Sequence, residues 1–299
     1  ALGKTFSTEY FDGRLDDTAI FDSTLAPSQI IGLANQSAQP NALPAAVDSP
    51  LVALYRFESS GDLGRDSSHV GNDLTSYGDS VVQAAGRYGS GLQLGGSNDF
   101  LGVANDNLGD ITGTPPGVPL LGSSYAISAW FKPDSDALSN AGIIGWGNYG
   151  SGNQVNALRL ASGDGVNNYW WSNDLNVDPI PGGVDLLDGD WHHVIAQYDA
   201  GTGLHEIYID GVLAGMRNAG GLNVMPENFR IGTTNGLGED FKGMLDDIAI
   251  FNRALSADER AFAASGDFTA FAPVPEPATA SLVLIAASGL LGRRRRSTK

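Results

Sequence analysis

The feature that most constrains the fold is a series of short segments in which apolar and polar residues alternate, separated by Gly, Asn, Asp and Pro. A period of two is typical of strands that bury one face, and the separating residues favour turns. Asp210 and Gly211 supply the positive φ angles of a hairpin turn. The predicted strands cover residues 51–57, 92–95, 125–133, 142–147, 157–162, 191–199, 205–215, 229–232 and 244–251. Roughly a dozen short strands predict an all-β, two-sheet antiparallel jelly-roll sandwich.

An internal similarity sets the domain map. The sequence YFDGRLDDTAIFDSTL at 10–25 matches DFKGMLDDIAIFNRAL at 240–255 without a gap, and a short helix is predicted after each copy. Ser256 and Glu259 form a capping box for the second helix. We interpret both copies as closing strands of the same kind of domain. The predicted parts are the remnant of an upstream repeat at 1–35, a Pro- and Ala-rich linker at 36–48 and the complete domain at 49–266.

Composition narrows the classes of function. The chain has 299 residues, 40 of them Gly, and no Cys, so a disulfide framework, a thiolate metal site and a Cys nucleophile are excluded. The formal net charge is −17. Because nucleic-acid binding depends on Lys and Arg at the phosphates, we expect no nucleic-acid partner. Divalent cations and neutral or cationic polysaccharides remain compatible with the charge.

The order of several motifs resembles the laminin-G-like, or concanavalin-A-like, jelly rolls of bacterial surface proteins. The motifs are LYRF at 54–57, DSS at 66–68, GRYG at 86–89, GLQL at 91–94, ISAWFKP at 127–133, WHHV at 191–194, YIDG at 208–211 and GMLDD at 243–247. Their specificity lies in the ordered set, since each piece alone is weak. The resemblance implies a fold, whereas lectins, adhesion modules and hydrolases all use this architecture.

The C-terminal residues 267–299 resemble a PEP-CTERM sorting tail. The tail consists of Pro275, Glu276 and Pro277, an apolar stretch at 278–292, and a basic end at 293–299 that begins with Arg293, Arg294, Arg295 and Arg296. We expect a short transmembrane helix over 278–292, about 22 Å long against a bilayer core of about 30 Å. The arginines are expected to stay cytoplasmic and to place the domain outside.

The resemblance also implies a processing route. An exosortase-type enzyme would remove the tail near its Pro-Glu-Pro motif, after the helix has held the precursor transiently in the inner membrane. We therefore expect an exported protein that starts as a membrane-anchored precursor and ends at the cell surface or in the extracellular matrix.

Aromatic residues are the candidates for ligand binding. Trp170 and Trp171 are expected to point to opposite faces of an extended segment, so that one ring reaches the surface. That ring would form a flat platform for a sugar together with neighbouring aromatic residues, and the candidate set is Trp146, Tyr149, Tyr169, Trp170 and Trp171. The alternative is ordinary aromatic packing in and around the core.

Acidic residues are the candidates for a structural metal. The pair Asp246–Asp247 recurs as Asp16–Asp17 in the upstream copy. The resemblance to calcium-bearing laminin-G-like domains suggests a structural Ca²⁺ with oxygen ligands from Asp66, Asn72, Asp99, Asp246 and Asp247. The alternative is that these side chains cap turns and accept backbone N–H bonds.

No catalytic residues are predicted. His192 and His193 lie on one strand without a nearby nucleophile pattern in the sequence, and a glycosidase motif Glu-x-Asp-x-Glu is absent. Glu206 and Asp210 come nearest to such a motif but lack the middle acid. The leading hypothesis is an exported non-catalytic binding or adhesion module that contacts extracellular polysaccharide or matrix. The alternatives are a structural spacer repeat of a larger surface protein and, third, a glycoside hydrolase.

Overall fold

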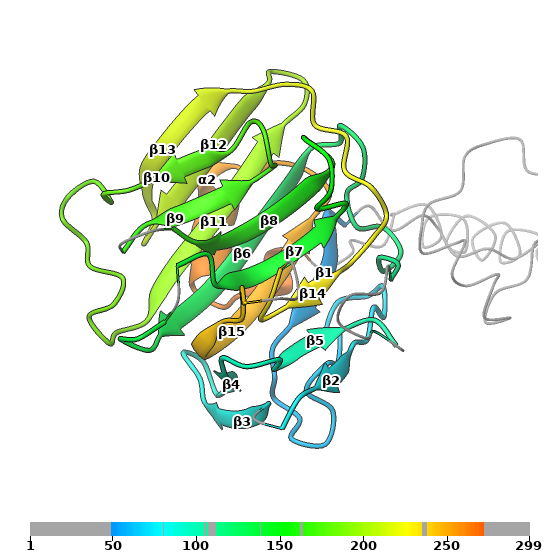
Figure 1. The fold of residues 1–299 in the computed structure, drawn as a ribbon, viewed down its shortest axis with the longest axis vertical. Helices are drawn as coiled ribbons and strands as arrows, with labels where there is room; N and C mark the ends of the chain where they lie inside the picture. Colours follow the sequence, from blue (N-terminus) through cyan, green and yellow to red (C-terminus); the bar gives the residue numbers. More distant parts are fainter. Residues whose placement is uncertain are drawn as a thin grey trace, which may run out of the picture. The chain divides into compact units, whose positions relative to one another are not determined.

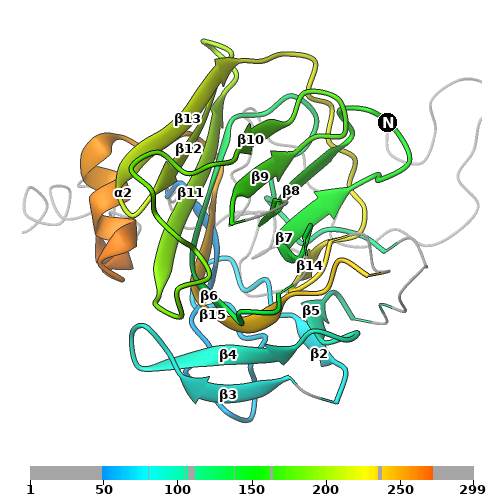
Figure 2. The ribbon, with the colours of Figure 1, turned by 60° about the vertical axis from the view of Figure 1, so that its left-hand side comes forward.

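The predicted alternation becomes two antiparallel sheets in the computed structural model, which describes residues 49–79, 81–104, 106, 112–137, 139–161, 164–234 and 238–271. The two sheets face each other as layers (Figures 1 and 2). One sheet has eight strands, in the spatial order β13 (Val212–Asn218), β12 (Leu204–Ile209), β11 (His192–Asp199), β6 (Tyr125–Pro133), β15 (Lys242–Phe251), β4 (Ser90–Gly95) and β3 (Val82–Ala85), with β1 (Leu51–Tyr55) paired to β15.

The second sheet has seven shorter strands. Their spatial order is β10 (Leu175–Val177), β9 (Val166–Tyr169), β8 (Val155–Leu160), β7 (Gly142–Gly147), β14 (Arg230–Ile231), β5 (Phe100–Gly102) and β2 (Thr75–Tyr77). The prediction of an all-β, two-sheet antiparallel sandwich is therefore confirmed. β2, β3, β5, β9 and β10 were not predicted, because strands of three or four residues are too short to show an alternating pattern.

The main core fills the space between the sheets. β6 shows how the alternation builds it, since Ile127 and Phe131 belong to the main core cluster whereas Ala126 belongs to a second cluster on the opposite face. On the facing sheet, Ile144 and Leu158 are opposed across β7 and β8 and are both fully buried. Period-two burial thus separates each strand into a core face and an outer face.

A short helix covers part of the outer face of the eight-stranded sheet. α2 (Ala257–Ala264) begins at Ser256, whose side chain accepts from the backbone N–H of Glu259 while the Glu259 side chain accepts from the N–H of Ser256, so the predicted capping box is confirmed. The predicted hairpin turn is confirmed as well, since Asp210 and Gly211 adopt φ of 48° and 80°. Both signals are local, which is why the sequence reveals them.

The packed domain continues beyond Gly266. A 3-10 turn, η1 (Phe268–Phe271), places Phe268 and Phe271 in the second cluster with Leu51 and Phe251. The Ser49 hydroxyl donates to the Phe271 carbonyl oxygen at 2.6 Å, so the two ends of the domain are fastened together. Burial of these two phenyl rings makes 267–271 part of the sandwich.

Several predicted segments lie outside the described residues. These are the repeat remnant at 1–35, the linker at 36–48, the sorting motif Pro275–Pro277, the apolar stretch at 278–292 and the basic end at 293–299. In the part of the chain that the structure describes, the helices are too short and too polar to cross a bilayer.

Candidate functional site

The two tryptophans at the centre of the predicted platform are core residues instead. Trp146 and Trp170 are 0% exposed. Both point between the sheets, where the indole of Trp146 donates to the Pro119 carbonyl oxygen at 2.9 Å and that of Trp170 donates to the Tyr125 hydroxyl at 3.0 Å. Their rings are closed off from the surface, so their assignment as ligand-binding residues is corrected.

Tyr169 and Trp171 do reach the surface together. They flank the buried Trp170, and their ring centroids are 5.9 Å apart on the outer side of the seven-stranded sheet. The Trp171 side chain is 45% exposed, and its φ of +75° lies in a region that bulky residues rarely occupy. Such a conformation costs roughly 1–3 kcal/mol and persists only where surrounding contacts impose it.

The turn that carries Trp171 is held by hydrogen bonds on both sides. The Asp174 carboxylate accepts from the backbone N–H of Trp170 at 2.7 Å, and the Trp170 carbonyl oxygen accepts from Asn153 at 2.7 Å. The Arg217 guanidinium donates to the Asp174 carbonyl oxygen at 2.8 Å. Hydrogen bonds therefore hold the turn that carries the exposed indole.

Polar groups surround these two rings. The Arg159 guanidinium lies 3.7 Å from the centroid of the Tyr169 ring and forms an ion pair with Glu239 at 3.1 Å, which neutralises its charge. Strand pairing places Asn167 opposite Arg159 and Asn176 opposite Asn167. Burial raises the pKa of Tyr169 to about 12, so its hydroxyl stays protonated. We call Tyr169, Trp171, Arg159, Asn167 and Asn176 the aromatic face.

Tyr149 packs against the same side of the sheet but offers little surface. It is 8% exposed, and its cluster includes Val155 and Ala157, with Tyr169 packed against it. Its hydroxyl is buried and finds no hydrogen-bond partner within the part of the chain that the structure describes, and burial raises its pKa. Gly145 makes room for it, because a Cβ there would lie 2.4 Å from the Tyr149 hydroxyl. Tyr149 thus supports the aromatic face from beneath.

Asp66 and Asn72, two of the predicted calcium ligands, are organisers of a loop. The two carboxylate oxygens of Asp66 accept four hydrogen bonds of 2.7–2.8 Å, from the backbone of Leu54, Ser68 and Asn72 and from the Ser68 hydroxyl. The Asn72 amide donates to two backbone carbonyl oxygens, those of Val52 and Pro116. These bonds cover the free edge of β1.

Asp246 and Asp247 lie at a bulge in β15. The ladder with β6 shifts register after Asp246, and Asp247 has a φ of +44°. One Asp246 oxygen accepts from Tyr88 N at 2.9 Å, and one Asp247 oxygen accepts from the Arg56 Nε at 3.0 Å. Burial raises the pKa of Asp246 to about 7 and that of Asp247 to about 6.

The five predicted ligands do not fit one calcium site. Asp99 lies in a separate turn, where its carboxylate accepts from the backbone N–H of Gly95 at 3.1 Å. Among the described residues, no three or more His, Asp or Glu side chains are grouped so that they could hold a metal ion. Ca²⁺ takes six to eight oxygen ligands, and the carboxylate oxygens of Asp66 and Asp246 are directed at backbone N–H groups instead.

The structure reveals two histidine arrangements that the sequence did not. His192 lies between two carboxylates, with its Nδ1 2.9 Å from Asp210 and its Nε2 3.2 Å from Asp188. Hydrogen bonding to Asp210 raises the pKa of His192. His193 faces the other side, with its Nε2 2.9 Å from the Ser128 hydroxyl, and burial lowers its pKa to about 4. The pairing of β6 with β11 creates the second contact, so spacing along the chain gives no sign of it.

The Ser128–His193 pair does not reach the surface. Ser128 is 0% and His193 2% exposed, so the pair is packed beneath other residues. The Glu206 carboxylate accepts hydrogen bonds from Gln197 and from the Tyr208 hydroxyl. The Asp210 carboxylate accepts from the backbone N–H of His193 and contacts the His192 ring, so both acids hold neighbouring groups in place.

Comparison with known proteins decides the family. A laminin G family model, described as the concanavalin A-like lectin/glucanases superfamily, matches residues 105–259, just over half of the chain. The chain belongs to the concanavalin A-like lectin/glucanases superfamily. The match spans both the aromatic face and most of the eight-stranded sheet. No curated protein sequence matches this superfamily member.

Solved structures with the same fold include several binding domains. Domain 4 of AbnA, an extracellular arabinanase of Geobacillus stearothermophilus solved with arabinotriose, is 21% identical with a TM-score of 0.53, and the match covers 72% of this chain and 98% of that one. The binding domain of Paraclostridial Mosquitocidal Protein 1 is 15% identical with a TM-score of 0.55. The ligand binding domain of botulinum neurotoxin serotype D, solved with N-acetylneuraminic acid, is 16% identical with a TM-score of 0.52.

The two toxin matches cover 74% and 75% of this chain but only 53% of each toxin-domain chain, so this superfamily member spans about half of their length. At these identities the likeness concerns the fold. The same fold thus occurs in a toxin binding domain and in two domains solved with a bound sugar.

Proposed function

We propose that this domain is a non-catalytic carbohydrate-binding module and that its ligand is an extracellular polysaccharide or matrix glycan. The observation that carries the proposal is the exposed Trp171 ring beside Tyr169 on a tethered turn. Two proteins of the same fold were solved with arabinotriose and with N-acetylneuraminic acid. These likenesses support a glycan as the class of ligand.

The chemistry of the aromatic face suits a sugar. The C–H face of a pyranose or furanose ring packs on an aromatic ring, and the indole offers the largest such surface. Asn176 is exposed, whereas the neighbouring Asn167 is buried and donates to the Asn176 amide oxygen. The Asn176 amide is therefore available to hydroxyl groups at the edge of the rings. Because Glu239 neutralises Arg159, the face favours an uncharged sugar.

The proposal also includes export and sorting. The resemblance of residues 267–299 to a PEP-CTERM tail supports an exosortase-type processing enzyme as a partner. In this scheme the precursor passes through the inner membrane with its arginines in the cytoplasm, and the domain ends at the cell surface or in the extracellular matrix. There it would meet the polysaccharide that we propose as its ligand.

A second candidate function is that of a spacer. The similarity between residues 10–25 and 240–255 favours it, because a protein built of repeated sandwiches can extend from a surface without binding anything. The two proposals differ in what the aromatic face does, since a spacer has no use for an exposed Trp in a costly conformation.

The test is binding of the purified chain to immobilised glycans, including arabino-oligosaccharides, sialylated glycans and exopolysaccharide from the source organism. Retention that depends on the aromatic face is expected. Absence of retention on every glycan would support the spacer. Glycan hydrolysis by the same preparation would contradict the non-catalytic assignment.

A further inference from the structure

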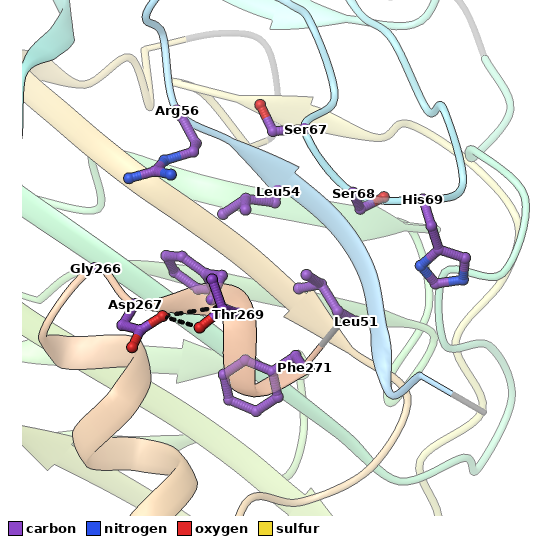
Figure 3. Close-up of a pocket in the computed structure, with 11 residues that line it drawn as sticks. Leu51, Leu54, Arg56, Ser67, Ser68, His69, Gly266, Asp267, Thr269 and Phe271 are labelled. Carbon is purple, nitrogen blue, oxygen red and sulfur yellow. Dashed lines mark hydrogen bonds between the residues drawn. The ribbon is translucent and has the colours of Figure 1, made fainter. Parts of the chain in front are cut away.

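A pocket lies on the outer face of the eight-stranded sheet, away from the aromatic face. Its volume is about 430 Å³, within the range of roughly 300–1,000 Å³ that is typical of small-molecule sites. β1 forms its floor, the 67–69 loop forms one wall and the 266–271 segment forms the other (Figure 3). Pairing of β1 with β15 fixes the floor in the eight-stranded sheet.

The floor and one wall are apolar. Leu51 and Leu54 of β1 and Phe268 and Phe271 of η1 line the pocket, and all four belong to the cluster on the outer face of the eight-stranded sheet. A ligand seated there covers the edge of a packed hydrophobic cluster, which favours a molecule with at least one apolar face.

Arg56 provides the positive charge of the pocket. It lies at one end, with His69 at the other and Leu54 between them (Figure 3). His69 does not contribute a second charge at neutral pH, because burial lowers its pKa. The Arg56 side chain is 35% exposed, and its Nε is bound to Asp247 at 3.0 Å.

The Nη1 and Nη2 atoms of Arg56 are available to a ligand. Among the described residues, the terminal Nη1 and Nη2 atoms have no hydrogen-bond partner, since Asp247 occupies only the Nε. Two parallel N–H groups of a guanidinium match the two oxygens of a carboxylate. Asp247 is 1% exposed and acts as a positioning residue from behind.

Hydroxyl and carboxylate groups line the walls. Ser67 and Ser68 lie on one wall, and Thr269 and Asp267 lie on the other. One Asp267 oxygen accepts from the Thr269 hydroxyl and from the Thr269 backbone N–H, the latter at 3.0 Å, and these two hydrogen bonds lower the pKa of Asp267. Asp267 is therefore an ionised acceptor, suited to sugar hydroxyl groups rather than to a second anion.

We propose that this pocket binds one uronic acid unit of an acidic glycan, with the sugar carboxylate on the Arg56 Nη1 and Nη2 atoms and the apolar ring face over Leu54. Polar walls distinguish this ligand from a fatty carboxylate, and Arg56 distinguishes it from a neutral sugar. The inference rests on the proposed function only in taking a glycan as the class of ligand.

The overall negative charge does not prevent this contact. At an ionic strength of about 0.15 M, charges more than about 8 Å away are largely screened, so Arg56 and its immediate neighbours set the local potential. Two carboxylates oppose an anion here. Asp247 already compensates the guanidinium, and the ionised Asp267 lines the opposite wall of the pocket.

Titration of the full chain at about 0.15 M salt, followed by calorimetry or NMR, tests the proposal. The probes are sodium D-glucuronate, D-glucose and sodium hexanoate. Glucuronate is expected to bind at least about tenfold more tightly than either of the others, because only it satisfies both Arg56 and the polar walls. Equal binding of glucuronate and glucose, or of glucuronate and hexanoate, would overturn the assignment without the need for any variant.

Variants then locate the contact. Arg56→Gln is expected to weaken glucuronate at least about tenfold, whereas Arg65→Gln, an exposed arginine outside the pocket, leaves it unchanged. Asp247→Asn removes the compensating charge and retains an oxygen for the Arg56 Nε, so it is expected to tighten glucuronate binding. A purely structural role for Asp247 predicts no such gain.

Two further measurements keep this result separate from the aromatic face. Arg56→Lys retains the positive charge. It replaces Arg56→Gln in the glucuronate titration if Arg56→Gln fails to fold. Trp171→Ala is expected to leave glucuronate binding unchanged, and loss of glucuronate binding in that variant would contradict a separate pocket. If the chain binds glucuronate but no neutral glycan, the proposed role of the aromatic face is wrong and the assignment of the pocket stands.

Discussion

The carboxylate of Asp246 accepts a hydrogen bond from the backbone N–H of Tyr88 at 2.9 Å, although the two residues are 158 positions apart. This bond joins the β15 bulge to the turn between β3 and β4. The Tyr88 hydroxyl in turn donates to the Ala264 carbonyl oxygen at the end of α2, at 3.0 Å. The motifs GRYG and GMLDD, which lie far apart in the sequence, thus meet in one buried joint.

Asp246→Asn is expected to destabilise the domain by about 1–3 kcal/mol. One oxygen of the carboxylate accepts from Tyr88 and the other from Asp247, so an amide would turn an N–H group toward one of these donors. Urea unfolding of the variant, with the exposed Asp62→Asn as control, measures the effect. Equal midpoints for both variants would show that the joint contributes nothing.

The contribution of Asp246 to the stability of the domain is expected to fall as the pH rises from 5 to 7. Burial raises the pKa of Asp246 to about 7, so between its ordinary value of 3.8 and 7 the folded state holds more protons than the unfolded state. Rising pH therefore removes stability through that window, and the pKa of Asp247, raised by burial to about 6, acts in the same direction. Burial lowers the pKa of His193 to about 4 and that of His205 to about 3, and these two groups act in the opposite direction below pH 6.5. The test is therefore the difference in denaturation midpoint between the unsubstituted chain and Asp246→Asn at pH 5, 6 and 7. This difference is expected to shrink as the pH rises, and a difference that is independent of pH would contradict the prediction.

His192→Gln is expected to destabilise the domain more at pH 5 than at pH 8. Asp210 and Asp188 raise the pKa of His192 above 6.5, so its contribution is complete below that value and is lost as the pH passes the folded pKa. The exposed His69→Gln is the control, since the pKa of His69 is lowered instead. A loss for His192→Gln that is independent of pH would show that packing, and not charge, holds the hairpin.

Phe271→Ala is expected to cost about 3–5 kcal/mol, because its ring is 2% exposed and packs 4.7 Å from that of Phe251. Phe262→Ala is the matched control, since Phe262 is 42% exposed on α2 and should lose little. Thermal unfolding of both variants measures the difference. Similar losses would mean that the 268–271 turn does not belong to the packed domain.

Calcium is expected to leave the melting temperature of the described domain unchanged. An ion at 100 times its Kd would add about 2.7 kcal/mol, which for a domain of this size is a rise of roughly 5–10 °C. The Asp66 and Asp246 oxygens that would bind it already accept backbone N–H groups. Melting in CaCl₂ and in EDTA decides the question, and a rise of several degrees in CaCl₂ would restore the calcium site suggested by the family resemblance.

The sequence predicts the structural features that depend on residues close to one another along the chain. The long strands, the Asp210–Gly211 turn and the Ser256 capping box follow from alternation and local hydrogen bonding. Period two also predicts that Trp170 and Trp171 point opposite ways, but it does not say which face is the core, and the structure buries Trp170.

The sequence does not predict features that depend on which strands are neighbours in a sheet. The contact of Ser128 with His193 exists because β6 lies beside β11. The pocket around Arg56 exists because the 266–271 segment folds back over β1, and the position of Trp146 in the core depends on the facing sheet. None of these partners is close in the sequence.

The most direct test of the central claim is the affinity of Trp171→Ala for the glycan that the chain retains, measured beside Phe262→Ala. The two side chains are 45% and 42% exposed, so both variants remove an equally accessible aromatic ring. The account predicts a loss of about 2 kcal/mol, roughly thirtyfold in Kd, for Trp171→Ala and no change for Phe262→Ala. Equal affinities of the two variants would contradict it.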